Sequence, residues 1–79
     1  MNNAIIILNY LNAIISHSNW YKIHRKYSGD LNYVSVIDTL DATIQYLANE
    51  KLIFVEKNAG EIDRIFISDL GKRYLVENH

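Results

Sequence analysis

The spacing of apolar residues divides the chain into a series of short elements. Residues 3–16 repeat apolar side chains at intervals of three and four, which predicts a first helix. The repeating residues are Ile7, Leu8, Leu11, Ile14 and Ile15. Apolar residues cover roughly twice the ~100° arc that an ordinary surface helix buries. One face is therefore expected to pack on its own domain, and the other to meet a partner subunit or form an exposed patch.

A second, shorter helix is predicted from about Asn19 to Tyr27, because Ser18 or Asn19 can serve as the N-cap and Gly29 can end it. One of its faces is apolar and consists of Trp20, Ile23 and Tyr27. The opposite face is basic and consists of Lys22, Arg25 and Lys26. These cations are either a solvated face or a surface for an anionic partner.

A third helix is predicted from Ser35 to about Glu50, with Ser35 and Asp38 forming a capping box. A regular apolar stripe marks its core side: Ile37, Leu40, Ile44 and Leu47. The opposite side is polar. This helix is therefore expected to lie on the domain surface with one face open to a partner, and Tyr33 and Tyr46 are expected to be exposed contacts.

The segments 52–57 and 63–68 alternate in polarity around a tip at Gly60, which predicts a β-hairpin. One antiparallel register matches both faces: Ile53 with Ile67, Phe54 with Phe66, Val55 with Ile65, Glu56 with Arg64, and Lys57 with Asp63. A last helix follows, capped by Ser68, with Leu70 and Tyr74 expected to face inward. The predicted class is mainly α with a small antiparallel hairpin (α+β), in the order helix-helix-helix-strand-strand-helix.

Composition limits the chain to a single domain, residues 1–79, near the small end of what folds alone. It has no cysteine, so disulfides and thiolate metal sites are excluded, and it has 49% hydrophobic residues and no proline, which argues against disorder. The apolar N-terminus lacks a basic leader and is shorter than the ~20 residues that cross a bilayer. A cytoplasmic protein without a membrane partner is therefore expected.

Charge is unevenly distributed along the chain. The formal net charge is only −1, but residues 1–29 contain three bases and no acid, whereas residues 30–79 contain nine acids and five bases. The first third of the chain is therefore the expected contact for any anion.

The chain resembles the winged helix-turn-helix superfamily, particularly the MarR-like and PadR-like regulators and small archaeal and phage-type members. Two short motifs carry the resemblance: Leu47-Ala48-Asn49-Glu50-Lys51-Leu52-Ile53 and Ile67-Ser68-Asp69-Leu70-Gly71. Lys51 stands where these families usually have glycine. It is therefore expected to adopt a positive φ at a cost of about 1 kcal/mol.

The resemblance implies that the third helix reads bases and that cations on the second helix and the hairpin bind phosphates. The expected DNA-binding residues are Lys22, Arg25, Lys26, Ser35, Thr39, Ala42, Gln45, Tyr46, Asn49, Lys57, Asn58 and Arg64. Since few phosphate contacts come from one chain, a homodimer on an inverted repeat is expected. Its expected interface is Ile6, Ile7, Tyr10, Leu11, Ile14, Leu75 and Val76.

Catalytic and metal-binding motifs are missing from the sequence, so neither an enzyme nor a cofactor or metal site is expected. The predicted function is a small sequence-specific regulator of transcription, of the kind carried by a virus, plasmid or other mobile element. The alternative is a winged-helix module that contacts or inhibits another protein without binding DNA, because fold does not dictate function and the third helix is acidic.

Overall fold

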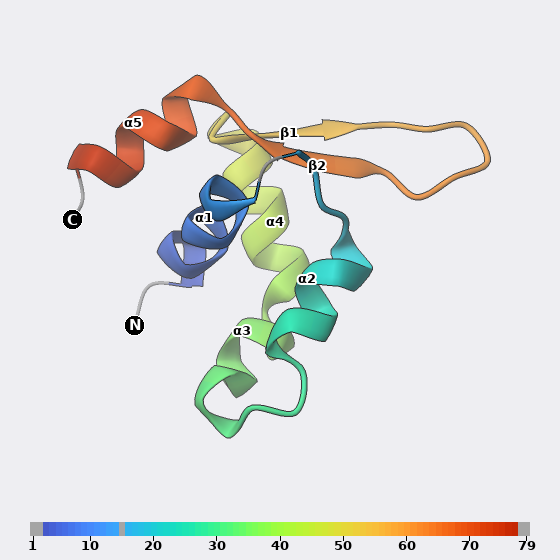
Figure 1. Cartoon of the computed structure of the whole chain (residues 1–79), viewed down its shortest axis with the longest axis vertical. Coiled ribbons are helices and arrows are strands. Elements are labelled where there is room, and N and C mark those ends of the chain that lie inside the picture. The colour runs from blue at the N-terminus through green and yellow to red at the C-terminus, as the bar shows by residue number, and fades with distance from the viewer. Residues whose placement is uncertain (1–2, 15, 78–79) are drawn as a thin grey trace.

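A computed structural model describes residues 3–14 and 16–77 and shows helices with one projecting hairpin (Figure 1). The elements, in order, are α1 (Asn3–Ala13), α2 (Trp20–Tyr27), the 3₁₀ helix η1 (Leu31–Tyr33), α3 (Val34–Asp38), α4 (Leu40–Asn49), β1 (Ile53–Glu56), β2 (Arg64–Ile67) and α5 (Asp69–Glu77). The predicted class, mainly α with an antiparallel hairpin, is confirmed.

Helix α1 is the centre of the core and contacts α4, α5 and β2. Its Ile7, Leu8 and Leu11 are fully or almost fully buried, together with Ile23 of α2 and Leu47 of α4. Complete burial of each such side chain contributes about 1.5–3 kcal/mol. The helix ends at Ala13 rather than at residue 16, and residue 15 lies outside the described residues.

Helix α2 forms as predicted. The side chain of Asn19 accepts a hydrogen bond from the backbone N–H of Lys22 at 2.9 Å, which caps the helix start. Gly29 follows the helix at φ 84°, a conformation that glycine adopts without a Cβ clash. Ile23 and Tyr27 are buried, so the basic face of this helix is directed outward.

The predicted third helix is wrong in two respects. It is broken at Thr39 into α3 and α4, and it begins at Val34 without the predicted Ser35–Asp38 capping box. At the break, the Thr39 hydroxyl donates to the carbonyl of Ser35 at 2.6 Å, and the Asn3 amide donates to that carbonyl and to Thr39 Oγ1. The Thr39–Ser35 bond is local and competes with the helical ladder, as threonine side chains commonly do, whereas the bonds from Asn3 come from a distant part of the chain.

The hairpin has the predicted register, with Phe54 opposite Phe66 and Val55 opposite Ile65. Its strands are shorter than the predicted 52–57 and 63–68. A bridge not predicted from the sequence joins Ser18 to Ile65 through two backbone hydrogen bonds of 2.8 and 2.9 Å. Ser18 is completely buried, and its hydroxyl lies 3.0 Å from the hydroxyl of Tyr10. The chain between α1 and α2 is thereby joined to the sheet.

A junction of four residues connects α4, the hairpin and α5. Lys51 adopts φ 60°, as expected from its place in the turn. The Ser68 hydroxyl donates to the Lys51 carbonyl at 2.7 Å and accepts from the Gly71 N–H at 3.0 Å, while the Ser68 N–H donates to the Leu52 carbonyl at 3.1 Å. A Cβ on Gly71 would overlap the Leu52 carbonyl and approach Ile67 Cγ1 to 2.8 Å. The first turn of α5 therefore lies directly against the backbone of Leu52, the residue before β1.

The predicted inward position of Leu70 is wrong, because this side chain is 45% exposed. Gly71 faces the backbone of Leu52, so the residue one turn later, Leu75, turns inward and is buried. Leu70 precedes Gly71 by about 100° of helical rotation and is directed to solvent. Tyr74 is half-buried against the core.

We expect Gly71→Ala to destabilise the protein by about 1–3 kcal/mol, because the added methyl group must displace the Leu52 backbone. Urea unfolding followed by circular dichroism measures the change as a lower midpoint. Lys72→Ala is the matched control, because Lys72 is the next residue of α5 and is exposed. Equal midpoints for the two variants would show that the close approach at Gly71 does not constrain the fold.

Candidate nucleic-acid interface

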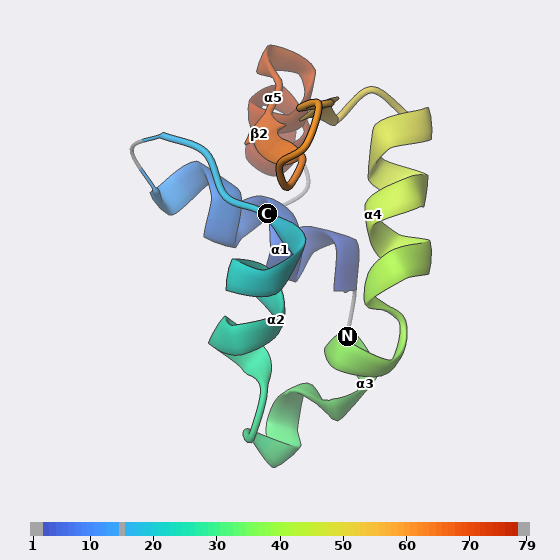
Figure 2. The same ribbon diagram turned by 90° about the vertical axis from the view of Figure 1, so that its right-hand side faces the viewer.

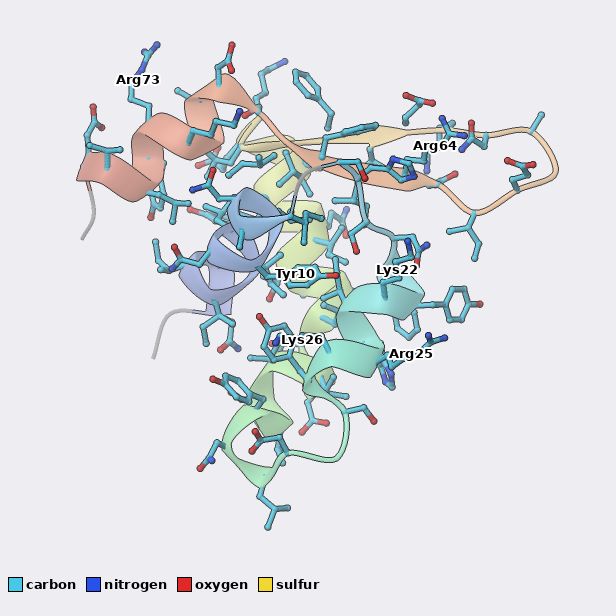
Figure 3. The ribbon with its side chains drawn as sticks, viewed as in Figure 1. Tyr10, Lys22, Arg25, Lys26, Arg64 and Arg73 are labelled. Carbon is cyan, nitrogen blue, oxygen red and sulfur yellow. The ribbon has the colours of Figure 1, made fainter. Side chains whose placement is uncertain are left out.

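The cations of α2 form an open basic surface. Lys22, Arg25 and Lys26 are all exposed, and none of them has a carboxylate partner within the part of the chain that the structure describes. Lys22 and Arg25 project outward from α2 (Figure 3), and Lys26 borders a depression beside Tyr10 and Tyr33. An anion that approaches α2 therefore meets cations that are not already neutralised.

The cations of the hairpin are paired with acids. Lys57 Nζ lies 2.8 Å from Asp63 Oδ2, and Arg64 Nη1 lies 3.4 Å from Glu56 Oε1, as the register predicts. The Asn58 amide donates to the Ile62 carbonyl at 3.2 Å. The three hairpin residues expected at a DNA interface are thus engaged within the hairpin.

Helix α4 presents polar and small side chains to solvent. Ala42, Gln45, Tyr46 and Asn49 are exposed and recur at helical spacing, so they share one side of the helix. Ser35 and Thr39 lie before or at the helix break, and both contact Asn3. The six residues expected on a single reading helix are therefore divided into two groups.

A hydrogen bond that the sequence did not reveal joins α2 to α4. Trp20 Nε1 donates to Asp41 Oδ1 at 2.6 Å, and the indole also stacks on His24 with ring centroids 4.9 Å apart. This contact joins the first residue of α2 to the first turn of α4. It therefore sets the position of the basic face relative to the polar face of α4. A tryptophan and an aspartate 21 residues apart carry no sequence signal for such a bond.

The tyrosines of α1, α2 and η1 form a packed cluster. Tyr27 lies edge-on to Tyr10 at 6.2 Å and against Tyr33 at 4.9 Å between ring centroids. Burial, and then the neighbouring tyrosines, raise the pKa of Tyr27, so its phenol stays neutral well above physiological pH. Tyr33 is half-buried in this cluster, and its expected role as an exposed contact is wrong. Tyr46 is 48% exposed, in agreement with its expected position.

Three of the seven residues expected at a dimer interface are covered by their own chain. Ile7, Leu11 and Leu75 are buried within their own chain, because α1 packs against α4 and α5. The remaining four are accessible: Ile6, Tyr10 and Ile14 line the half-open depression of about 540 Å³ beside Lys26, and Val76 on α5 is 71% exposed.

Among residues 3–14 and 16–77, no group of three or more histidines, aspartates or glutamates is placed to hold a metal ion. No described helix combines the length and apolar character needed to cross a membrane. Comparisons of this chain with protein-family models, curated proteins and solved structures found no match.

The Lys57–Asp63 pair gives a measurable test of the hairpin geometry. The hydrogen bond from Lys57 lowers the pKa of Asp63 below its ordinary value of 3.8. Because the pKa of Asp63 is lower in the folded state than in the unfolded state, the pair stabilises the fold at pH values above the ordinary pKa. This stabilisation is lost as the pH falls through the lower pKa of the folded state. We expect Lys57→Ala to raise the pKa of Asp63 toward 3.8, measured by NMR titration of its carboxyl carbon. Arg64→Ala removes the other pair and is the control, and it should leave the pKa of Asp63 lowered.

Proposed function

We propose that this chain is a winged helix-turn-helix protein that binds double-stranded DNA and acts as a small dimeric regulator of transcription. In this proposal, α2 and the broken helix α3–α4 form the helix-turn-helix, and β1 with β2 forms the wing. In Figure 2 the hairpin lies above α2 and beside the end of α4 that leads into β1. The order of elements and the strand-like bridge of Ser18 to β2 support this arrangement.

The observation that carries the proposal is the unequal pairing of cations. Lys57 and Arg64 are neutralised within the hairpin, whereas Lys22, Arg25 and Lys26 are exposed without acidic partners in the described chain. Affinity for DNA comes largely from unpaired cations that displace counterions from phosphates. Helix α2 is therefore the proposed phosphate contact, and the hairpin contributes little charge.

Base recognition is proposed to come from the exposed side of α4. Gln45 and Asn49 have amide groups that can pair with the edge of adenine, and Ala42 can contact the methyl group of thymine. The Trp20–Asp41 hydrogen bond holds α4 beside the basic helix, so phosphates and bases are contacted by neighbouring elements. Occupation of the operator alone would then block or recruit polymerase, and no cofactor is required.

Dimer formation completes the proposal, because a single chain offers few phosphate contacts and would bind weakly at physiological salt. A two-fold dimer doubles these contacts and matches an inverted repeat. The accessible members of the expected interface are Ile6, Tyr10, Ile14 and Val76.

A second function is favoured by the acids of α3 and α4. Asp38 and Asp41 are exposed near the start of the proposed reading helix, where they repel phosphate. The whole chain carries a net charge of −1. These charges favour a module that binds another protein through the same surface.

The two functions are separated by titrating fluorescent random-sequence duplex with the protein at several salt concentrations and measuring anisotropy. We expect binding at low salt with a steep loss of affinity as salt rises. The slope of the logarithm of the binding constant against the logarithm of the salt concentration reports the number of neutralised phosphates. In the double variant Lys22→Ala/Arg25→Ala its magnitude should fall by about 0.9 for each phosphate contact that is lost.

The matched control is Lys72→Ala/Arg73→Ala, which removes the same charge from α5, far from α2 (Figure 3). It should bind as the unchanged chain does. An equal loss in both double variants would indicate a nonspecific effect of net charge. Absence of binding at low salt would overturn the DNA proposal and favour the protein-binding module.

The dimer is tested by light scattering after size exclusion, where we expect twice the 9.2 kDa of one chain. Val76→Lys should shift the mass toward one chain, because it places a charge in the proposed interface at a position that is open in the isolated fold. A monomer mass for the unchanged chain at high concentration contradicts this part of the proposal.

A further inference from the structure

An apolar groove lies where α2 begins, between α4 and the hairpin. It is open to solvent and has a volume of about 620 Å³, and Ile44, Ala48 and Val55 are half-buried along it. Tyr21 and Ile62 border the groove and are 58% and 48% exposed. Its volume is typical of small-molecule sites, which measure about 300–1,000 Å³.

The charges along this groove are unbalanced. Two carboxylates, Asp41 and Asp63, line it together with one ammonium group, Lys57, which is paired with Asp63. Asp41 therefore has no cationic partner among the described residues. Its Oδ1 is held by Trp20 Nε1 at 2.6 Å, and its Oδ2 has no hydrogen-bond partner in the same part of the chain. The groove thus carries one fixed negative charge beside an apolar surface.

An indole borders the groove next to this carboxylate. Trp20 is held by its hydrogen bond to Asp41 and by stacking on His24, and the exposed ring of Tyr21 packs edge-on against it at 5.2 Å. Aromatic faces attract cations, most strongly when the cation is partly removed from water. Because His24 covers one face of the indole, the exposed ring of Tyr21 and the Asp41 carboxylate are the groups that favour a positively charged ligand and disfavour an anion.

We propose that this groove binds a small organic cation with an aromatic or branched apolar body. The ammonium group of the ligand lies at Asp41 beside Trp20, and the apolar body lies along Ile44, Ala48 and Val55. Binding removes apolar surface from water and supplies the missing partner of the carboxylate. This site does not depend on the proposed DNA binding.

The test uses 4-tert-butylbenzylamine as the cationic probe, with the neutral alcohol and the anionic benzoate of the same shape as comparisons. Trp20 is the only tryptophan of the chain, so its indole N–H gives a single NMR signal inside the site. The amine should shift this signal and bind about tenfold more tightly than the alcohol, the gain expected for a hydrogen bond to a charged group. The benzoate should bind more weakly than the alcohol.

Asp41→Asn keeps an oxygen for the indole hydrogen bond and removes the charge. This variant should bind the amine about as weakly as the alcohol. Asp69→Asn, on exposed α5, is the matched control and should leave the amine affinity unchanged. Ile62→Ser should weaken the amine and the alcohol equally, because it shortens the apolar border. Equal binding of amine and alcohol, an unaffected Asp41→Asn variant, or no shift with any probe would overturn the inference.

A consequence for DNA rests on the proposed function. Gln45 lines the groove and is also a proposed base contact, so the bound amine should lower the affinity for duplex DNA. If the amine shifts the indole signal but leaves the affinity for duplex DNA unchanged, the proposed placement of DNA is contradicted and the ligand site is retained. Unchanged DNA binding together with an unshifted indole signal would overturn the ligand site alone.

Discussion

The close approach of α5 to Leu52, the residue before β1, restricts how α5 lies against the rest of the fold. Gly71 lies against the Leu52 carbonyl, and Ser68 connects the Lys51 carbonyl to the first turn of α5 through one hydroxyl group. Because a side chain at Gly71 would force these backbones apart, sterics restrict the orientation of α5 in addition to its packing on α1. Burial of Leu75 and exposure of Leu70 both follow from that restriction.

The second constraint lies between α2 and α4. A single hydrogen bond from Trp20 to Asp41 joins the starts of these helices, and the break at Thr39 lets α4 take a direction different from that of α3. The same carboxylate that positions α4 also gives the adjacent groove its negative charge. One residue therefore contributes to the architecture, to the proposed placement of α4 on DNA, and to the proposed cation site.

The pairing of charged side chains distinguishes the surface of α2 from that of the hairpin, whereas the net charge of the chain does not. With a net charge of −1 the chain as a whole does not attract a polyanion, yet Glu56 and Asp63 are paired with cations of the hairpin, and no acid precedes residue 30. The exposed face of α2 formed by Lys22, Arg25 and Lys26 therefore carries positive charge even though the molecule is weakly acidic. A partner recognised through α2 and one recognised through the groove must carry opposite charges.

The sequence alone determined the features that depend on neighbours along the chain. A cap at Ser18 or Asn19, the positive φ of Lys51 and the register of Phe54 with Phe66 were all predicted, because caps, turns and paired strands are governed by local spacing; Asn19 is the residue that forms the cap. Tertiary structure alone decided the break at Thr39, where Asn3 from a distant part of the chain donates to Ser35 and Thr39. It also decided the burial of Ile7, Leu11 and Leu75 within one chain. An amphipathic pattern shows that a face is buried, but which surface covers it depends on how the helices pack in three dimensions.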